Sequence, residues 1–152
     1  MKIVTVIGAR PQFIKAAMVS HAIAKKHPKA ISEILVHTGQ HYDASMSNIF
    51  FDQMSIPKPN YNLGIHAVRH GEMTGRMLTD IEPILISEAP DVVIVYGDTN
   101  STIAAALASS KLGIDVAHIE AGLRSYDRAM PEEINRVLTD HLSKSLFCPS
   151  PQ

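Results

Sequence analysis

The segment DVVIVYGDTNS, residues 91–101, decides the fold. Its residues 92–96, VVIVY, form an uninterrupted apolar run without the alternation of a half-exposed strand. Such a run is typical of a strand that is buried on both faces of a parallel sheet. The alanine-rich residues 101–111 follow as an expected helix, which Gly113 ends. A buried strand followed directly by a helix is the repeating unit of α/β domains with a parallel sheet.

Apolar runs and helical stretches alternate along the rest of the chain in the same way. Residues 55–64 carry two prolines and predict an extended loop, and Pro83 predicts a kink or break in a long helix. The alternation predicts a doubly wound α/β fold, a Rossmann-like three-layer sandwich with a parallel sheet. The expected strands are 2–7, 31–37, 91–97, 114–120 and 145–148, and the expected helices are 11–26, 43–53, 71–89, 101–111 and 131–142.

Composition narrows the class of protein. The chain has 152 residues, 45% of them hydrophobic, which is enough for one globular domain with its own core. A formal net charge of −1 gives no electrostatic argument for binding nucleic acid. Cys148 is the only cysteine, which fits a reducing compartment, and no apolar run approaches the roughly 18–20 residues of a membrane span. We therefore expect a cytoplasmic domain that binds neither nucleic acid nor membrane.

Ionisable and amide side chains gather just after the expected strands. The carboxyl ends of parallel strands share one rim, where ligands of open α/β sheets bind. Two cations near a helix start suit a phosphate or carboxylate, and carboxylates beside them suit proton transfer. The candidates are the cations Arg10 and Lys15, the carboxylates Asp98, Glu120 and Glu132, and the further polar residues Arg136, Gln40 and His41.

Each candidate also has a purely structural interpretation. Arg10 and Lys15 could be a solvated helix start, and Asp98 could be the N-cap of the helix that follows it. Glu132 could complement the dipole of its helix, as its neighbour Glu133 could. Glu120 is the hardest to explain in this way, because it ends an apolar strand and is expected to be partly buried.

Two common cofactor motifs are excluded. The turn GARPQF, residues 8–13, lacks the second and third glycines of a dinucleotide fingerprint, and it is not a P-loop. His66 and His70 are four residues apart, but no supporting cysteine or H-E-x-x-H pattern accompanies them. We expect neither a metal nor another cofactor.

Five motifs together resemble the non-hydrolysing UDP-N-acetylglucosamine 2-epimerases. The resemblance covers the whole chain but only the first half of such an enzyme, which has the two-domain GT-B fold. It implies that residues 1–152 are the N-terminal Rossmann-like domain, that a C-terminal nucleotide-binding domain is absent, and that the chain alone is inactive. An ending in CPSPQ, directly after an expected strand, also favours a fragment. The motifs are GARPQFIK (8–15), HTGQHYD (37–43), YGDTNST (96–102), HIEAGLRS (118–125) and MPEEINRVLTDHLS (130–143).

The resemblance also implies a reaction without a cofactor and a role for each candidate. UDP-GlcNAc and UDP-ManNAc interconvert by elimination of UDP to a 2-acetamidoglucal and re-addition of UDP. The enzymes are usually homodimers and supply precursors of cell-surface polysaccharides. The implied roles are acid–base catalysis for Asp98, Glu120 and Glu132, substrate binding for Arg10, Lys15 and Arg136, and binding of an allosteric UDP-GlcNAc for Gln40 and His41.

Two alternatives stay open. The motifs YGDTNST and RSYDRAMPEEINR most resemble the branch of the family that includes UDP-2,3-diacetamido-2,3-dideoxyglucuronate 2-epimerases. Half of a GT-B glycosyltransferase would share the architecture, although a transferase needs no cluster of three carboxylates directed at C2 of the sugar.

Overall fold

The computed structural model describes residues 1–40 and 58–150, so the expected helix 43–53 and His41 lie outside the described residues. A six-stranded sheet with the order β3-β2-β1-β4-β5-β6 forms the centre, and all its described pairings are parallel. The predicted fold class is confirmed. The strands are β1 Lys2–Ile7, β2 Ser32–His37, β3 Tyr61–Asn62, β4 Val92–Tyr96, β5 Asp115–Ile119 and β6 Ser145–Phe147.

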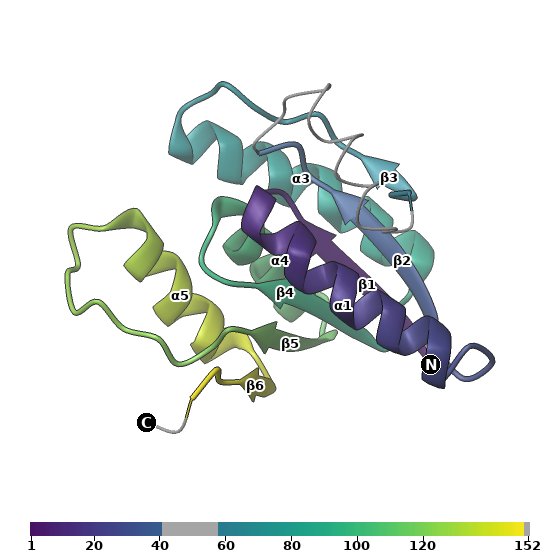
Figure 1. Cartoon of the computed structure of the whole chain (residues 1–152). Helices are drawn as coiled ribbons and strands as arrows, with labels where there is room; N and C mark the ends of the chain where they lie inside the picture. Colours follow the sequence, from purple (N-terminus) through teal and green to yellow (C-terminus); the bar gives the residue numbers. More distant parts are fainter. Residues whose placement is uncertain (41–57, 151–152) are drawn as a thin grey trace.

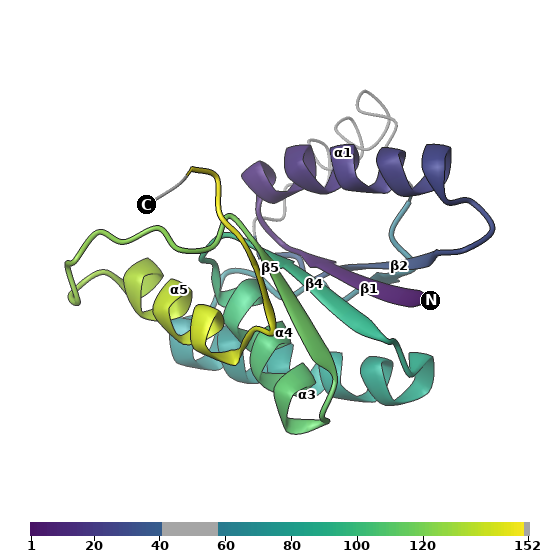
Figure 2. The same cartoon turned by 90° about the horizontal axis from the view of Figure 1, so that it is seen from below.

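Helices cover both faces of the sheet and make the sandwich three-layered (Figure 1). Seen from below, α1 lies on one face and α3, α4 and α5 lie on the other (Figure 2). The helices are α1 Arg10–Lys26, α3 His70–Glu88, α4 Asn100–Lys111 and α5 Pro131–Leu142. The expected extended loop 55–64 contains the two-residue strand β3, which the prolines of that segment had obscured.

The apolar run of β4 is divided between the two faces of the sheet. Val93 and Val95 pack into the core cluster that includes residues of α3 and α4. Ile94 and Tyr96 pack into the second cluster, with Phe13 of α1. A strand whose alternate side chains enter two cores needs apolar residues at every position, which explains why the run is uninterrupted.

Helix α3 continues through Pro83, so the expected break is not present. Proline removes one backbone hydrogen bond from a helix interior. Ile81 and Leu85, on either side of Pro83, are fully buried in the core. Packing of this apolar stripe against the sheet compensates for the lost hydrogen bond.

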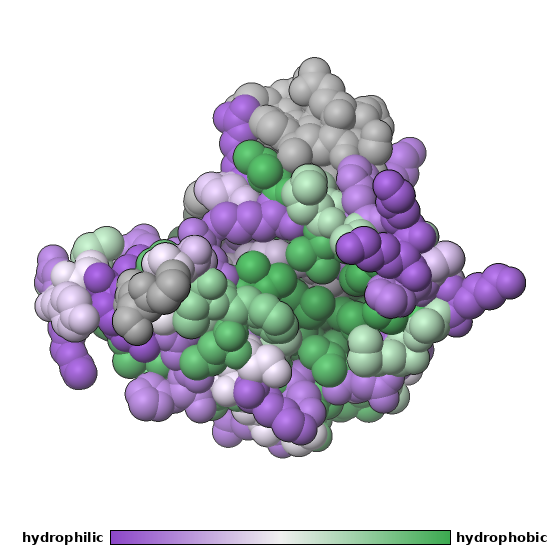
Figure 3. Space-filling model, turned by 60° about the horizontal axis from the view of Figure 1, so that its bottom comes forward, coloured by the Kyte–Doolittle hydropathy of each residue, from purple (hydrophilic) through white to green (hydrophobic). Residues whose placement is uncertain are grey.

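Part of the sheet face beside α1 carries exposed hydrophobic side chains. Ile119 of β5 and Phe147 of β6 are register partners, so both point to the face that carries α1. Phe147 is 57% exposed. Hydrophobic residues gather at the centre of the face shown in Figure 3. Within residues 1–40 and 58–150, no helix is long and apolar enough to cross a membrane.

Candidate active site

A pocket of about 230 Å³ lies at the carboxyl ends of β1, β4 and β5. It is the rim at which the sequence predicted a ligand site. The turn after each of these strands supplies part of the lining, and α5 supplies another part. Five of the predicted site residues line the pocket: Lys15, Gln40, Asp98, Glu120 and Glu132.

Gln12 joins two of the turns that form the pocket. Its Oε1 accepts hydrogen bonds from the backbone N–H groups of Gly8, at 2.7 Å, and Ala9, at 2.9 Å. Its Nε2 donates to the carbonyl oxygen of Tyr96 at 2.7 Å and to Oγ1 of Thr99 at 2.9 Å. Gln12 is buried, and it ties the β1–α1 turn to the β4–α4 turn. Sequence reasoning missed this residue, because a glutamine in the first turn of a helix gives no sign of burial.

Lys15 and Glu120 form an ion pair across the pocket. Lys15 comes from the second turn of α1, and Glu120 is the first residue after β5. Both side chains remain about one-third exposed, at 35% and 32%, so a ligand can reach them. Glu120 has a backbone φ of +70°, a left-handed conformation that is rare for residues other than glycine. The expectation that Glu120 is partly buried is confirmed.

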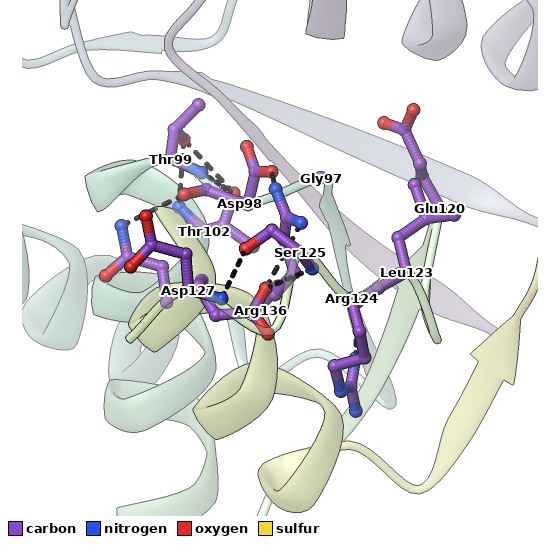
Figure 4. A network of polar contacts seen from close by, with 12 residues as sticks. Gly97, Asp98, Thr99, Thr102, Glu120, Leu123, Arg124, Ser125, Asp127 and Arg136 are labelled. Carbon is purple, nitrogen blue, oxygen red and sulfur yellow. Dashed lines mark hydrogen bonds and ion pairs between the residues drawn. The ribbon is translucent and has the colours of Figure 1, made fainter. Parts of the chain in front are cut away.

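Asp98 pairs with Arg136 of α5, as Figure 4 shows. It does not cap α4. Thr99 is the N-cap, and its Oγ1 accepts a hydrogen bond from the backbone N–H of Thr102 at 3.3 Å. The structural interpretation of Asp98 as a helix cap was therefore wrong, and its carboxylate is available to the pocket.

The two adjacent glutamates of α5 have different environments. Glu133 is buried and accepts hydrogen bonds from the backbone N–H groups of Ser125 at 2.9 Å and Tyr126 at 3.1 Å. These hydrogen bonds, that of Ser125 above all, lower the pKa of Glu133. Glu132 is exposed and lines the pocket, and among the described residues its carboxylate has no hydrogen-bond or ion-pair partner. Glu132 is thus accessible to a ligand in the pocket, whereas Glu133 holds the backbone of Ser125 and Tyr126 in place.

Arg136 links Asp98, in the turn after β4, to Glu133 of α5. Its Nη1 donates to Oε2 of Glu133 at 3.2 Å while its Nη2 pairs with Asp98. The guanidinium of Arg136 does not pair with Glu132, four residues before it on α5, because it turns to these two carboxylates instead. Arg136 is not itself among the residues that line the pocket.

The remaining predicted residues differ in position. Arg10 is exposed at the first position of α1 and does not line the pocket. Oε1 of Gln40 accepts hydrogen bonds from the backbone N–H and the hydroxyl of Ser101, at 3.0 and 2.8 Å. Gln40 also lines the pocket that contains the carboxylates. His41, its expected partner in an allosteric site, lies outside the described residues, so that role stays a prediction.

The residues that line the pocket but were not among the candidates include His70, Asn100 and Asn135. Nδ1 of His70, the first residue of α3, lies 3.1 Å from Nδ2 of Asn100. Nδ2 of Asn135 donates to the carbonyl oxygen of Asp98 at 2.9 Å. Asn100 and Asn135 lie in the motifs YGDTNST and MPEEINRVLTDHLS, but only the fold brings them together with His70. In the part of the chain that the structure describes, no three potential metal ligands cluster.

Chemically, the pocket has side chains suited to anion binding and to proton transfer. Two cation–carboxylate pairs, Lys15 with Glu120 and Arg136 with Asp98, come from opposite sides, and Glu132 adds a third carboxylate. An anionic ligand can compete with a carboxylate for its cation, which frees the carboxylate to accept a proton.

Known proteins of similar sequence include nucleotide-sugar 2-epimerases. The chain is 63% identical over 150 residues to the UDP-2,3-diacetamido-2,3-dideoxy-D-glucuronate 2-epimerase of Pseudomonas aeruginosa, matching 99% of this chain and 42% of the relative. It is 53% identical to the UDP-N-acetylglucosamine 2-epimerase of Methanocaldococcus jannaschii, matching 99% of this chain and 40% of the relative.

A solved structure agrees closely in fold. The crystal structure of the M. jannaschii UDP-GlcNAc 2-epimerase in complex with UDP-GlcNAc and UDP superposes with a TM-score of 0.94 at 53% identity, covering 99% of this chain and 41% of that chain. The chain spans about two-fifths of the length of these relatives. The family model for UDP-N-acetylglucosamine 2-epimerase matches residues 22–152. The chain belongs to the UDP-N-acetylglucosamine 2-epimerase family.

Proposed function

We propose that this chain supplies the acid–base part of a nucleotide-sugar 2-epimerase that interconverts UDP-GlcNAc and UDP-ManNAc. One observation carries the proposal: the three carboxylates Asp98, Glu120 and Glu132 and the cation of Lys15 converge on one pocket at the carboxyl rim of the sheet. Lys15 pairs with Glu120 there, and Arg136 pairs with Asp98 from outside the pocket lining. Family membership supports the same reaction class.

The reaction needs the groups that this pocket offers. The C2 hydrogen of the sugar is not acidified by a neighbouring carbonyl, so simple deprotonation is costly. Elimination avoids this cost: a base removes the C2 proton, a C1–C2 double bond forms, and the C1–O bond breaks with its electron pair leaving on UDP. Re-addition returns a proton to the opposite face of C2 and restores the C1–O bond. Carboxylates on more than one side of the sugar can serve both steps.

The roles divide by charge. Lys15, with Arg10 on the same helix start, binds the diphosphate that leaves and returns, assisted by the positive end of α1. Asp98, Glu120 and Glu132 transfer the protons. Arg136 orients Asp98 through their ion pair.

The enzyme has a second half in this proposal. Residues 1–152 form the first of two Rossmann-like domains of a GT-B enzyme, and the active site is completed by the other. The length of the relatives, about two and a half times that of this chain, supports the division. The exposed hydrophobic side chain of Phe147 fits a surface that another part of the protein covers. A homodimer in the cytoplasm is the corresponding expectation for the whole enzyme.

A second substrate has specific support. The relative named for UDP-2,3-diacetamido-2,3-dideoxy-D-glucuronate is 63% identical to this chain, and the UDP-N-acetylglucosamine 2-epimerase homolog of Methanococcus maripaludis is 65% identical. Sequence identity therefore supports this second substrate about as strongly as the first. Both reactions invert C2 by the same elimination, so the pocket carboxylates would serve either. The two differ in the substituents at C3 and C5 of the sugar.

The test is conversion by the full-length protein. The protein is incubated with each UDP-sugar in turn, and proton NMR follows the sugar H1 and H2 signals. We expect a C2-epimeric mixture from one of the two without an added acceptor. Consumption of the nucleotide sugar only when an acceptor is present would instead indicate a glycosyltransferase. The 152-residue chain alone is expected to convert neither substrate, and robust conversion by it would contradict the two-domain proposal.

A further inference from the structure

A buried histidine lies behind the pocket and plays no part in the chemistry described above. His118 of β5 is fully buried. Its Nδ1 lies 2.7 Å from Oδ1 of Asp140, and its Nε2 lies 2.6 Å from the carbonyl oxygen of Gly97. Both partners are acceptors, so both ring nitrogens must carry a proton for both contacts to be hydrogen bonds. The geometry is that of an imidazolium ring whose counter-ion is Asp140.

The carboxylate of Asp140 has further partners on its other oxygen. Oδ2 accepts a hydrogen bond from the backbone N–H of Gly122 at 3.1 Å and pairs with Nη1 of Arg124 at 2.6 Å. Asp140 is 8% exposed and belongs to α5. The pair of His118 and Asp140 therefore connects β5, the turn after β4, the turn after β5, and α5.

Each of these connections reaches a segment of the chain that carries one of the pocket carboxylates. Gly97 directly precedes Asp98, and Gly122 follows Glu120 by two residues. Asp140 lies eight residues after Glu132 on α5. The three carboxylates come from three separate segments, and this one buried pair bonds to all three segments.

The turn after β5 has a backbone that needs such support. Glu120 and Gly122 have φ angles of +70° and +81°. A left-handed conformation at a residue other than glycine costs about 1–3 kcal/mol and persists only where the surroundings impose it. The hydrogen bond from Gly122 to Asp140, with that from the backbone N–H of Glu120 to the carbonyl oxygen of Phe147 at 3.0 Å, holds the turn in place. In Figure 4 the side chains of Glu120 and Arg124 leave this turn in opposite directions, Arg124 away from the Asp98–Arg136 pair.

We propose that His118 and Asp140 are positioning residues, a charged junction that sets the distances among Asp98, Glu120 and Glu132. The inference rests on the proposed epimerase function. The junction does not contact substrate. It acts by fixing the relative positions of the three segments that carry the carboxylates while charge and protons move in the pocket.

Asp140→Asn in the full-length enzyme is the direct test. The side chain keeps its size, but its amide group must face donors: either His118, or Gly122 and Arg124. Misplacement of reacting groups by about 1 Å costs on the order of 10²-fold in rate. We therefore expect kcat to fall by about 10²-fold, with little change in KM, because the side chains of His118 and Asp140 do not themselves bond to Lys15, which binds the diphosphate in the proposed function.

Glu88→Gln is the matched control. Glu88 also accepts two side-chain hydrogen bonds, from Tyr61 at 2.6 Å and Lys2 at 3.2 Å, but it lies beside the start of β1, at the opposite rim of the sheet. We expect it to lower the melting temperature without changing kcat. If Asp140→Asn changed kcat by less than twofold, or no more than Glu88→Gln does, the junction would be purely structural and the proposal overturned.

Two further measurements keep the test decisive. Nitrogen-15 NMR of the wild-type enzyme should show a directly bound proton on both ring nitrogens of His118, and an unprotonated ring nitrogen would overturn the imidazolium junction. This readout does not depend on epimerase activity, so its failure is distinguishable from failure of the proposed function. If Asp140→Asn does not fold, Arg124→Gln replaces it: a fall in kcat of about 10-fold or more supports the junction, and an unchanged kcat overturns it.

Discussion

Gly8, at the turn between β1 and α1, should not tolerate even a methyl group. A Cβ atom at this position would lie 2.2 Å from Oγ of Ser101 and 2.2 Å from Oγ1 of Thr38. Ordinary van der Waals contacts begin at 3.4 Å, so both oxygens would have to move by about 1 Å. Both side chains are fully buried and bonded to each other at 2.8 Å, which leaves them no free space.

The magnitude follows from the two effects that relieve the clash. Overpacking of a tight core costs about 1–3 kcal/mol. Rotation of either hydroxyl out of the way leaves a buried polar group without its partner, at about 1–3 kcal/mol more. Gly8→Ala should therefore lower the free energy of unfolding by about 2–6 kcal/mol. It should also lower kcat, because Ser101 lies in the first turn of α4, directly after the Asp98 turn.

Urea unfolding followed by circular dichroism measures the effect, with Gly75→Ala as the matched control. Gly75 lies inside α3, and a Cβ atom there would meet nothing within 4 Å. Alanine is the better helix former by about 1 kcal/mol, so this variant should be more stable than the wild type. If Gly8→Ala were within about 0.5 kcal/mol of the wild type, the packing described for this turn would be wrong.

Three further predictions test the catalytic role of Glu120, the titration of His37 and the helix cap at Thr99. Glu120→Gln should lower kcat by about 10²–10⁴-fold in steady-state kinetics. It should change the free energy of unfolding by less than about 1 kcal/mol, because the Lys15 pair is partly exposed, and a large loss of stability would contradict a catalytic role. Burial lowers the pKa of His37, so below pH 6.5 the unfolded state binds the proton first and stability should fall as pH falls. The slope should approach about 1.4 kcal/mol per pH unit in urea titrations and disappear in His37→Gln, and an unchanged slope in that variant would refute the assignment. Thr99→Ala should cost about 0.5–2 kcal/mol and Thr99→Ser much less, since only the first removes the oxygen that caps α4; equal stabilities in thermal melts would argue against the cap.

Local sequence patterns predicted most of the fold because hydrophobic periodicity and breakers act over a few residues. The run of β4 and the proline that begins α5 at Pro131 placed those elements closely. The two-residue strand β3 escaped, because it exists only by pairing with β2. Pro83 did not end its helix for a related reason, since burial of the residues beside it outweighed its local penalty.

The location of the candidate site, at the carboxyl ends of the strands, could be predicted from the sequence. The ion pairs within the site could not. Strand ends indicated Asp98 and Glu120, because the carboxyl ends of parallel strands meet at one edge. Their partners were not predictable: Lys15 and Glu120 are 105 residues apart, and no local rule joins them. His118 illustrates the limit most clearly. It lies in the motif HIEAGLRS, next to the candidate Glu120, yet it faces the interior, because it is paired in register with buried Val95.

The most direct test of acid–base epimerisation in this pocket is hydrogen exchange at C2. The full-length enzyme is incubated with UDP-GlcNAc, or with its diacetamido-glucuronate counterpart, in heavy water, and the sugars are examined by NMR and mass spectrometry. Removal of the C2 proton by a carboxylate that exchanges with solvent predicts one deuterium at C2 of the epimerised product. An epimer that retains its original hydrogen at C2, or turnover that leaves C2 untouched, would contradict the account.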